Sequence, residues 1–305
     1  MVMKYLTDED LGALGVRSDE IVTALERALV SLRDGQISAA PKASVIAPDG
    51  RYMMATLSAS DGMGVIVVKS VMVNDRNKER GLPGINGAIM VMDAETGVLK
   101  CVMDANWVTA VRTAGLSAVA AKRLADPKSE ILALVGTGVQ AESHMRALAD
   151  LFPLKKIRAF GRGEAGIAKT RDVAESLGLD FEACDPQSCL QGADIVVSSV
   201  TLDYTIEPFL DANWLKDGAF AAITDLGIPW SDAGQSAFSR VYVDDLAQER
   251  AMAKPMIAPE LITGELADLV VEDISHDAKR SAFIFRGIAL GDLAVAALAY
   301  ERASS

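Results

Sequence analysis

The chain has 305 residues, half of them apolar, and a formal net charge of −12 at pH 7. This length and apolar content suffice for one large or two ordinary globular domains. The acidic balance and the scarcity of Lys/Arg clusters argue against nucleic acid and anionic membrane surfaces as partners, because both require a basic face. A small molecule is the expected partner.

The N-terminal run MVMKYLTDEDLG has one lysine followed by acids and lacks the apolar core of a signal peptide. No apolar run approaches the roughly 18 residues of a membrane span, which predicts a cytoplasmic protein.

Cys101, Cys184 and Cys189 show no CxxC spacing, and His144 and His276 are the only histidines. We therefore expect free buried thiols, with no disulfide framework and no metal site.

The first part of the chain combines helical and strand patterns. Apolar residues recur at helical spacing over residues 18–32, and Gly35 follows, which predicts an amphipathic helix. From Ala43 to Asp93, short apolar or alternating runs separated by PDG, DGMG and GLPGING predict a mostly antiparallel β-region. A long Ala-rich helix is predicted over Ala105–Ala125. The AspPro pair at 126–127 ends this helix, and we place a domain junction there.

Beyond the junction, predicted strands alternate with helices. The runs ILALV, KKIRAF, DIVVSSV, GAFAAIT and VYVDD are the strands, and helices are predicted over Gln140–Leu151 and Glu164–Leu177. Alternation of this length predicts an α/β fold with a doubly wound parallel sheet and helices on both faces. The C-terminal run GIALGDLAVAALAYERA is predicted to be a helix that packs back on the N-terminal region.

Residues 131–140, ILALVGTGVQ, join a strand to a helix through two glycines. In such a turn the first glycine permits the bend, the second lets the backbone approach a pyrophosphate, and the helix N-terminus offers unpaired N–H groups. Ala141 stands in the place of the third glycine. The position of this turn at the head of a βαβα run favours a dinucleotide site over a bare glycine turn. The predicted cofactor-binding residues here are Gly136, Thr137, Gly138, Val139 and Gln140.

The second strand of this unit does not end in the acid that usually binds the ribose of NAD. It ends in Gly161-Arg162-Gly163. Arg162 suits a 2′-phosphate or an adenine face, which favours NADP(H) without excluding NAD(H); a solvated loop arginine is the alternative. Thr113 and Thr201 are two further candidates for contact with the cofactor.

Four segments carry a resemblance to a known family. MDANWVTAVRTAGLSAVAAKRLA, GTGVQA, ITGELADL and GIALGDLAVAA together resemble the ornithine cyclodeaminase and mu-crystallin family, in the order and spacing expected from about residue 40 onward. The resemblance implies a Rossmann domain, residues 126–284, inserted in a second α/β domain formed by residues 1–125 plus 285–305. That second domain is implied to bind substrate and to form a homodimer through its sheet. The shared chemistry of the family is hydride exchange between an α-imino acid and a nicotinamide.

The resemblance also implies which residues hold the substrate. Lys69 in VVKSV and Arg112 in AVRTA match the family positions that bind the substrate carboxylate. From the residues alone, a Lys within an apolar strand and an Arg on an Ala-rich helix each need a partner if buried, whereas snorkelling surface side chains are the alternative. Lys69 or Asp225 is expected to supply the proton at the imine nitrogen. Asn86, in the PGING turn, is a further candidate for a polar contact.

Two positions depart from the family pattern. The usual Pro-x-Arg is Pro41-Lys42-Ala43 here, so only Lys42 or Arg51 is left to replace the arginine. The usual Gly-Ala-Asp run corresponds to ITDLG at 223–227, so the catalytic acid is either Asp225, which could instead be a helix cap, or absent. Both departures weigh against ornithine as the substrate.

The sequence therefore predicts a dimeric NAD(P)H-dependent imine reductase that produces a small L-amino acid. Reduction of iminosuccinate to L-aspartate is the first specific prediction, because Lys42, Arg51, Lys69 and Arg112 provide cations for a dicarboxylate. Two alternatives stay open: a cyclodeaminase that recycles bound NAD, and a non-catalytic NAD(P)H- and ligand-binding protein of the mu-crystallin type.

Overall fold

The computed structural model describes residues 3–305, apart from the side chains of residues 75 and 78. It divides into two compact units. The first unit runs to Arg112 and resumes from Ile288 to Ser305, and the second comprises Thr113–Gly287. The first division falls inside the helix α3 (Ala105–Leu124), which ends just before the AspPro pair at 126–127. Domain limits at residues 125 and 285 stay a prediction.

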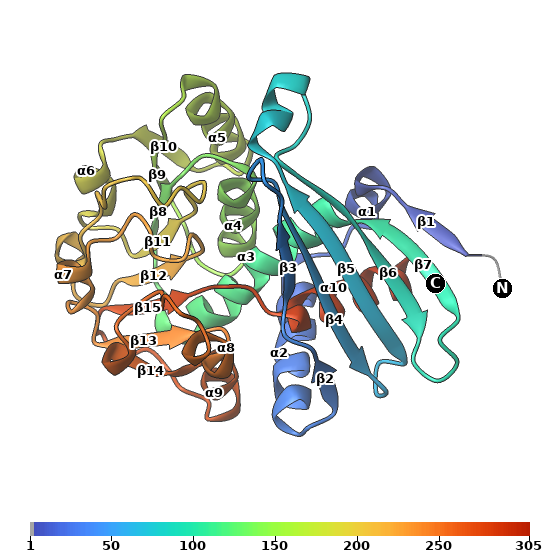
Figure 1. The fold of residues 1–305 in the computed structure, drawn as a ribbon. Helices are drawn as coiled ribbons and strands as arrows, with labels where there is room; N and C mark the ends of the chain where they lie inside the picture. The colour runs from blue at the N-terminus through green and yellow to red at the C-terminus, as the bar shows by residue number, and fades with distance from the viewer. Residues whose placement is uncertain (1–2) are drawn as a thin grey trace. The chain divides into compact units, whose positions relative to one another are not determined.

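The first unit contains a mixed sheet in the order β1-β7-β6-β5-β4-β2, with β3 also paired to β4 (Figure 1). β2 to β6 form antiparallel pairs with their neighbours, as the pattern over residues 43–93 predicts, whereas β1 runs parallel to β7. The strands are β1 (Lys4–Leu6), β2 (Ile37–Ala39), β3 (Ala43–Ile46), β4 (Tyr52–Ser60), β5 (Val65–Val73), β6 (Ile85–Asp93) and β7 (Leu99–Asp104).

Helices cover one face of this sheet. α10 (Ala289–Arg302) lies against β4, β5 and β6, and α2 (Ser18–Arg33) packs on α10 and β2. Side chains alternate across β5, so that Val67, Lys69 and Val71 are buried on the face toward α10. The remaining helical segments of this unit are α1 (Asp8–Ala13), the 3₁₀ turn η1 (Asp75–Arg80) and the first half of α3.

The second unit contains a parallel sheet in the order β10-β9-β8-β11-β12-β15-β13-β14. Its first strand lies inside the sheet, and the order reverses between β8 and β11, which is the arrangement of the Rossmann fold. The predicted fold class is confirmed. The strands are β8 (Ile131–Val135), β9 (Lys156–Phe160), β10 (Asp180–Ala183), β11 (Ile195–Ser198), β12 (Phe220–Ile223), β13 (Arg240–Val243), β14 (Ile262–Glu265) and β15 (Ser281–Ile284).

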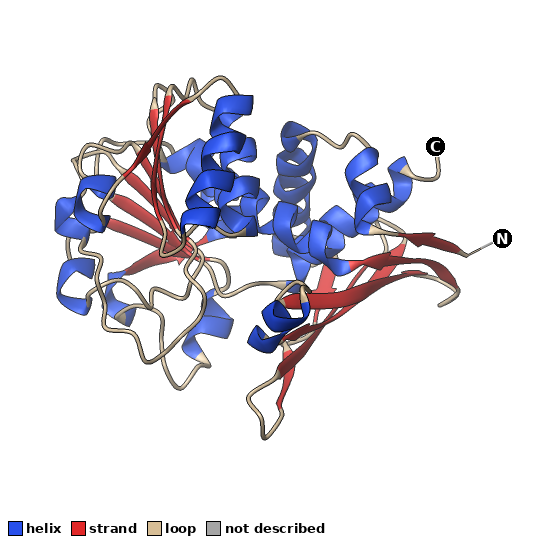
Figure 2. Ribbon diagram, turned by 90° about the horizontal axis from the view of Figure 1, so that it is seen from above, coloured by secondary structure: helices blue, strands red, loops and turns tan. Residues whose placement is uncertain are grey.

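Helices flank the strands of this sheet on both sides (Figure 2). They are the second half of α3, α4 (Val139–Ala149), α5 (Glu164–Ser176), α6 (Pro186–Leu190), α7 (Asp232–Gln235), α8 (Leu246–Arg250) and α9 (Leu266–Val271), with 3₁₀ turns η2 (Ala212–Trp214) and η3 (Pro259–Leu261). Because both faces are covered, β11, β12 and β15 are buried along their whole length. Within residues 3–305, no helix has the length and apolarity needed to cross a membrane.

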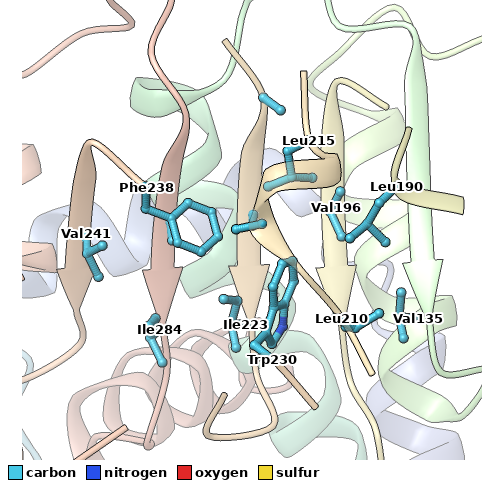
Figure 3. Packing of buried hydrophobic residues seen from close by; sticks show 14 of the residues in the cluster. Val135, Leu190, Val196, Leu210, Leu215, Ile223, Trp230, Phe238, Val241 and Ile284 are labelled. Carbon is cyan, nitrogen blue, oxygen red and sulfur yellow. The ribbon is translucent and has the colours of Figure 1, made fainter. Parts of the chain in front are cut away.

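The core of the second unit contains Trp230, which lies beside Ile223 (Figure 3). The Trp230 ring packs on Phe238 with 5.7 Å between ring centroids. Its indole N–H donates to the hydroxyl of Ser198 at 2.9 Å, so the polar edge of this buried ring is satisfied at the end of β11.

Candidate functional site

Three buried charged side chains meet in the first unit. The Lys69 ammonium lies 2.8 Å from Oδ1 of Asp292, and Nε of Arg112 lies 3.1 Å from the same oxygen. Their side chains are 1%, 6% and 2% exposed for Lys69, Arg112 and Asp292. The hydroxyl of Thr56 donates to the other carboxylate oxygen at 3.1 Å. The structure thus brings together the two predicted substrate-carboxylate residues, and we call Lys69, Arg112 and Asp292 the ionic cluster.

The strand register positions this cluster. On β4, Thr56 stands directly opposite Lys69, and cross-strand partners project to the same face of an antiparallel pair. That face is the one covered by α10, and Asp292 lies in the first turn of this helix, where the helix dipole favours an acid. The alternation of β5 turns Lys69 toward the core. There it pairs with Asp292, which lies at the end of α10 where the helix dipole stabilises an acid.

The residues of the ionic cluster shift one another's pKa values. Burial and the neighbouring charge of Arg112 lower the pKa of Lys69 to about 8, although Asp292 acts in the opposite direction; Lys42 lowers it further. Burial alone would raise the pKa of Asp292, but the charges of Arg112 and Lys69 outweigh it and hold that pKa below its ordinary value. Asp292 is therefore a carboxylate at neutral pH, while Lys69 is still an ammonium at pH 7 and loses its proton as the pH rises through about 8.

The two glycines of the turn in the second unit differ in the space around them. Gly136 has φ +103°, and a Cβ there would lie 2.6 Å from the carbonyl oxygen of Ser199, so only glycine fits. A Cβ at Gly138, the N-cap of α4, would meet nothing within 4 Å. The Thr137 side chain packs against Gly161 and Gly166, which leaves its backbone, and not its side chain, to face a ligand.

Two polar atoms near this turn are buried without a partner. Among the described residues, Oε1 of Gln140 and Oγ of Ser199 have no hydrogen-bond partner. Buried polar groups are otherwise almost always satisfied, so this pair indicates a place for a polar ligand. Together with the open side at Gly138, they fit a dinucleotide phosphate at the N-terminus of α4. Gln140 is a predicted cofactor residue, whereas Ser199 is not among the predictions.

Asp225, the predicted acid, is enclosed at the end of β12. Its side chain accepts from the Ser198 hydroxyl and the Val200 N–H, both at 3.1 Å, and the residue is 1% exposed. Burial raises the pKa of Asp225 to about 6, even though these hydrogen bonds oppose the shift. The following helix, α7, is capped by Ser231 and not by Asp225. Asp225 therefore secures the end of β11, and its catalytic role stays a prediction.

The structure does not bring every predicted residue of the first unit to the cluster. Asn86 pairs with Met72, which places it on the sheet face opposite Lys69, and its amide donates to the Pro83 carbonyl at 2.7 Å. Arg51 forms an ion pair with Asp49 at 2.8 Å on the surface. Lys42 is partly buried and lies close enough to influence the pKa of Lys69.

The remaining predicted cofactor residues of the second unit lie in different surroundings. Thr113 is buried on α3, directly after Arg112. Val139, Arg162 and Thr201 are exposed. The side chains of Val139, Arg162 and Thr201 are therefore accessible to a ligand, but they do not form a pocket by themselves.

The sequence prediction missed Asp292 and Thr56. The signal for Asp292 lies in GIALGDLAVAA, where a single acid interrupts an otherwise apolar helix. A buried acid of this kind requires a cation as its partner, and a buried Lys69 or Arg112 requires an acid. The ion pairs of Asp292 with Lys69 and Arg112 could therefore have been proposed from the sequence. Thr56 gives no comparable signal, because a threonine in a strand is ordinary.

A Rossmann unit with a ligand-ready glycine turn, in the same chain as an α/β unit that buries a Lys-Arg-Asp cluster, defines a dinucleotide-binding type of protein. The chain belongs to the ornithine cyclodeaminase/mu-crystallin family, whose model matches residues 4–305. The resemblance noted from the sequence is confirmed.

Named relatives span most of the chain. Ketimine reductase mu-crystallin of Mus musculus is 28% identical over 94% of this chain and 93% of its own length. Iminosuccinate reductase of Paracoccus denitrificans is 30% identical over 74% and 73%, respectively. An archaeal alanine dehydrogenase dimer with bound NAD superimposes with a TM-score of 0.88, at 24% identity, over 100% of this chain and 97% of that one. The expectation of a nicotinamide-dependent oxidoreductase agrees with the names of these relatives.

Proposed function

We propose that the chain is an NAD(P)H-dependent oxidoreductase that reduces a small α-imino acid to an L-amino acid. The observation that carries this proposal is the buried ionic cluster of the first unit, in which Lys69 and Arg112 share the carboxylate of Asp292. The reductase and dehydrogenase names of the relatives support the same class of reaction.

The cluster suits a substrate carboxylate. The cations Arg112 and Lys42 and the acid Asp292 all act on the pKa of Lys69. We propose that the substrate carboxylate binds beside Lys69 and Arg112, because a charge-assisted hydrogen bond is strong in a buried place. The planar guanidinium of Arg112 fixes the orientation of that carboxylate better than an ammonium does.

The residues of the glycine turn fit a dinucleotide. The backbone of residues 136–140 would hold its phosphates, with Gln140 Oε1 and Ser199 Oγ as further polar contacts. A nicotinamide bound there supplies hydride chemistry. Arg162, exposed after β9, favours the 2′-phosphate of NADP(H), and NAD(H) stays the alternative.

Lys69 is the proposed proton donor. Reduction of an imine adds a hydride at carbon and a proton at nitrogen, so a group that holds a proton at neutral pH must stand near the nitrogen. With a pKa of about 8, the Lys69 ammonium is protonated at pH 7 and releases its proton readily. Asp292 keeps the ammonium in place, and Asp225 acts as a positioning residue for the end of β11.

The sheet of the first unit is the proposed homodimer interface. On the face opposite α10, cross-strand pairing aligns Leu57, Val68, Met90, Val102 and Tyr5 in one row. Leu57, Met90 and Tyr5 are 46%, 40% and 57% exposed, an apolar surface that a second copy would cover. Leu57→Glu together with Met90→Glu should yield monomers by light scattering, whereas Val98→Glu, at an exposed turn, should leave the dimer intact.

The first specific substrate we propose is iminosuccinate, reduced to L-aspartate. Arg51 forms a surface ion pair with Asp49, and Lys42, whose charge acts on Lys69, is the cation that we propose for the second carboxylate. A single assay tests the proposal: nicotinamide absorbance with oxaloacetate plus ammonia, pyruvate plus ammonia, or pyrroline-2-carboxylate, each with NADH and NADPH. Net cofactor oxidation is expected. Ammonia release from ornithine without net oxidation would instead indicate a cyclodeaminase, and tight cofactor binding without turnover a binding protein.

A further inference from the structure

Two cysteines of the second unit form a pair that neither the glycine turn nor the ionic cluster uses. Cys184 directly follows β10, and Cys189 lies on α6. We propose that Cys184 and Cys189 are a redox-active dithiol that forms an intramolecular disulfide when the protein meets a peroxide. The proposal is independent of the imine reductase function.

The sheet places the two sulfurs against neighbouring strands, at positions that are in register. The Cys184 thiol lies 3.9 Å from the carbonyl oxygen of Ala159 on β9, and the Cys189 thiol lies 3.8 Å from that of Leu134 on β8. Leu134 and Ala159 are register partners on these adjacent strands. Neighbouring strands lie only about 4.8 Å apart. Each thiol is also the largest influence on the pKa of the other.

The two thiols differ in exposure and in the direction of their pKa shifts, as formation of a disulfide through a sulfenic acid requires. Cys184 is partly exposed, whereas Cys189 is fully buried. Interaction with the Cys189 thiol lowers the pKa of Cys184, and Arg158 acts in the same direction, whereas burial and the charge of Glu182 oppose them. The same interaction, together with burial, raises the pKa of Cys189. The thiolate therefore forms on the accessible sulfur, where it reacts first.

The chemistry proceeds in two balanced steps. The Cys184 thiolate attacks hydrogen peroxide, the O–O bond breaks, and the sulfur is oxidised to a sulfenic acid as hydroxide leaves. The Cys189 sulfur then attacks the sulfenic sulfur, an S–S bond forms, the S–O bond breaks, and the proton of Cys189 leaves with the oxygen as water. Two thiols and one peroxide thus give one disulfide and two water molecules, and an external dithiol reverses the change.

The position of Asp185 makes a direct test possible. The reduced full chain is treated with hydrogen peroxide, its remaining thiols are alkylated, and it is cleaved before aspartates. Cleavage before Asp185 separates the two cysteines into the peptides 180–184 and 185–193. We expect mass spectrometry to find these peptides joined after peroxide treatment and separated again by dithiothreitol. Cys101, buried in the other unit, should stay alkylatable once the protein is denatured.

Variants assign the two roles. Cys189→Ser should let the sulfenic acid on Cys184 persist, so that dimedone labels peptide 180–184, and Cys184→Ser should abolish both labelling and cross-linking. Cys101→Ser is the matched control and should cross-link like the parent. Peptides that remain separate in the parent chain, with Cys184 either unmodified or oxidised while Cys189 stays free, would overturn the proposal, as would cross-linking to Cys101.

Discussion

Two buried aspartates, one in each unit, have opposite electrostatic surroundings. Asp292 on α10 and Asp225 after β12 are both 1% exposed. Asp292 faces two cations, and their charges hold its pKa below the ordinary value in spite of burial. Asp225 accepts hydrogen bonds from neutral donors only, and burial raises its pKa to about 6. Equal burial therefore produces opposite titration, because charged neighbours and not exposure decide the outcome.

The difference separates two kinds of role. An acid that stays ionised and shares its charge with two cations can organise a binding site for another anion, as we propose for the ionic cluster. An acid that neutral donors enclose holds backbone in place and is costly to ionise. Substitutions at these two acids and their partners should therefore have different effects.

Asp292→Asn should cause the largest loss of stability. The substitution leaves Lys69 and Arg112 as neighbouring buried cations without their carboxylate, which typically costs about 3–5 kcal/mol of unfolding free energy. Thr56→Val is the matched control, because it removes only a hydroxyl donor from the same carboxylate and should cost about 1 kcal/mol. Urea denaturation of both variants measures the difference, and equal losses would show that the charge of Asp292 has no special part.

Arg112→Ala should have the largest effect on substrate use. Loss of a buried charge-assisted contact should lower kcat/KM for the imino acid by a factor equivalent to about 2–5 kcal/mol, mainly through a higher KM. Arg17→Ala removes an exposed arginine that pairs with Asp19 at the surface of the same unit and should leave the kinetics unchanged. Parent-like kinetics in Arg112→Ala would contradict its place in the substrate site.

Asp225→Asn should reveal itself in the pH dependence of stability. The folded state favours the neutral form of Asp225, so this contribution is complete below the unfolded pKa of about 4 and is lost as the pH rises through about 6. Relative to the parent, the variant should therefore gain about 3 kcal/mol of unfolding free energy between pH 4 and pH 7. Asp292→Asn should change in the opposite direction and only below about pH 4, because the folded pKa of Asp292 is depressed and the parent loses this contribution as the pH falls through it. If the unfolding free energies of the two variants depended on pH in the same way, the opposite pKa shifts of Asp225 and Asp292 would be contradicted.

Lys69 should impose a smaller effect on the rate. Its folded pKa of about 8 means that the ammonium loses its proton as the pH rises through that value. We expect kcat/KM to fall about tenfold per pH unit above it, since the neutral amine neither attracts the carboxylate nor donates a proton. Lys69→Arg keeps its charge at high pH, so this decline should be absent from its residual activity. A decline that persists there would assign the titration to another group.

Much of this arrangement follows from local sequence patterns. The glycine turn at residues 136–138 and the long helix α3 are visible in short stretches, because turn chemistry and helical periodicity act over a few residues. The burial of Lys69 follows from the alternation of β5. These features therefore could be predicted before the structure.

Other features depend on contacts that no local pattern encodes. Lys69 and Asp292 are separated by 223 positions in the chain, and only the packing of α10 on β5 joins them. β10, with the sequence DFEA, has a single large apolar residue and no strand signal, yet it pairs with β9 along its whole length. Arg51 is a plausible substrate cation until the structure shows its pairing with Asp49.

The central claim is that Lys69 and Arg112 recognise the carboxylate of an imine substrate. The most direct test compares reduction of pyrroline-2-carboxylate with that of 1-pyrroline, which has the same ring imine but no carboxylate, in the parent chain and in Arg112→Ala. We expect the parent to prefer the carboxylate-bearing imine strongly and the variant to lose that preference. An equal loss of activity on both imines, with the preference unchanged, would contradict it.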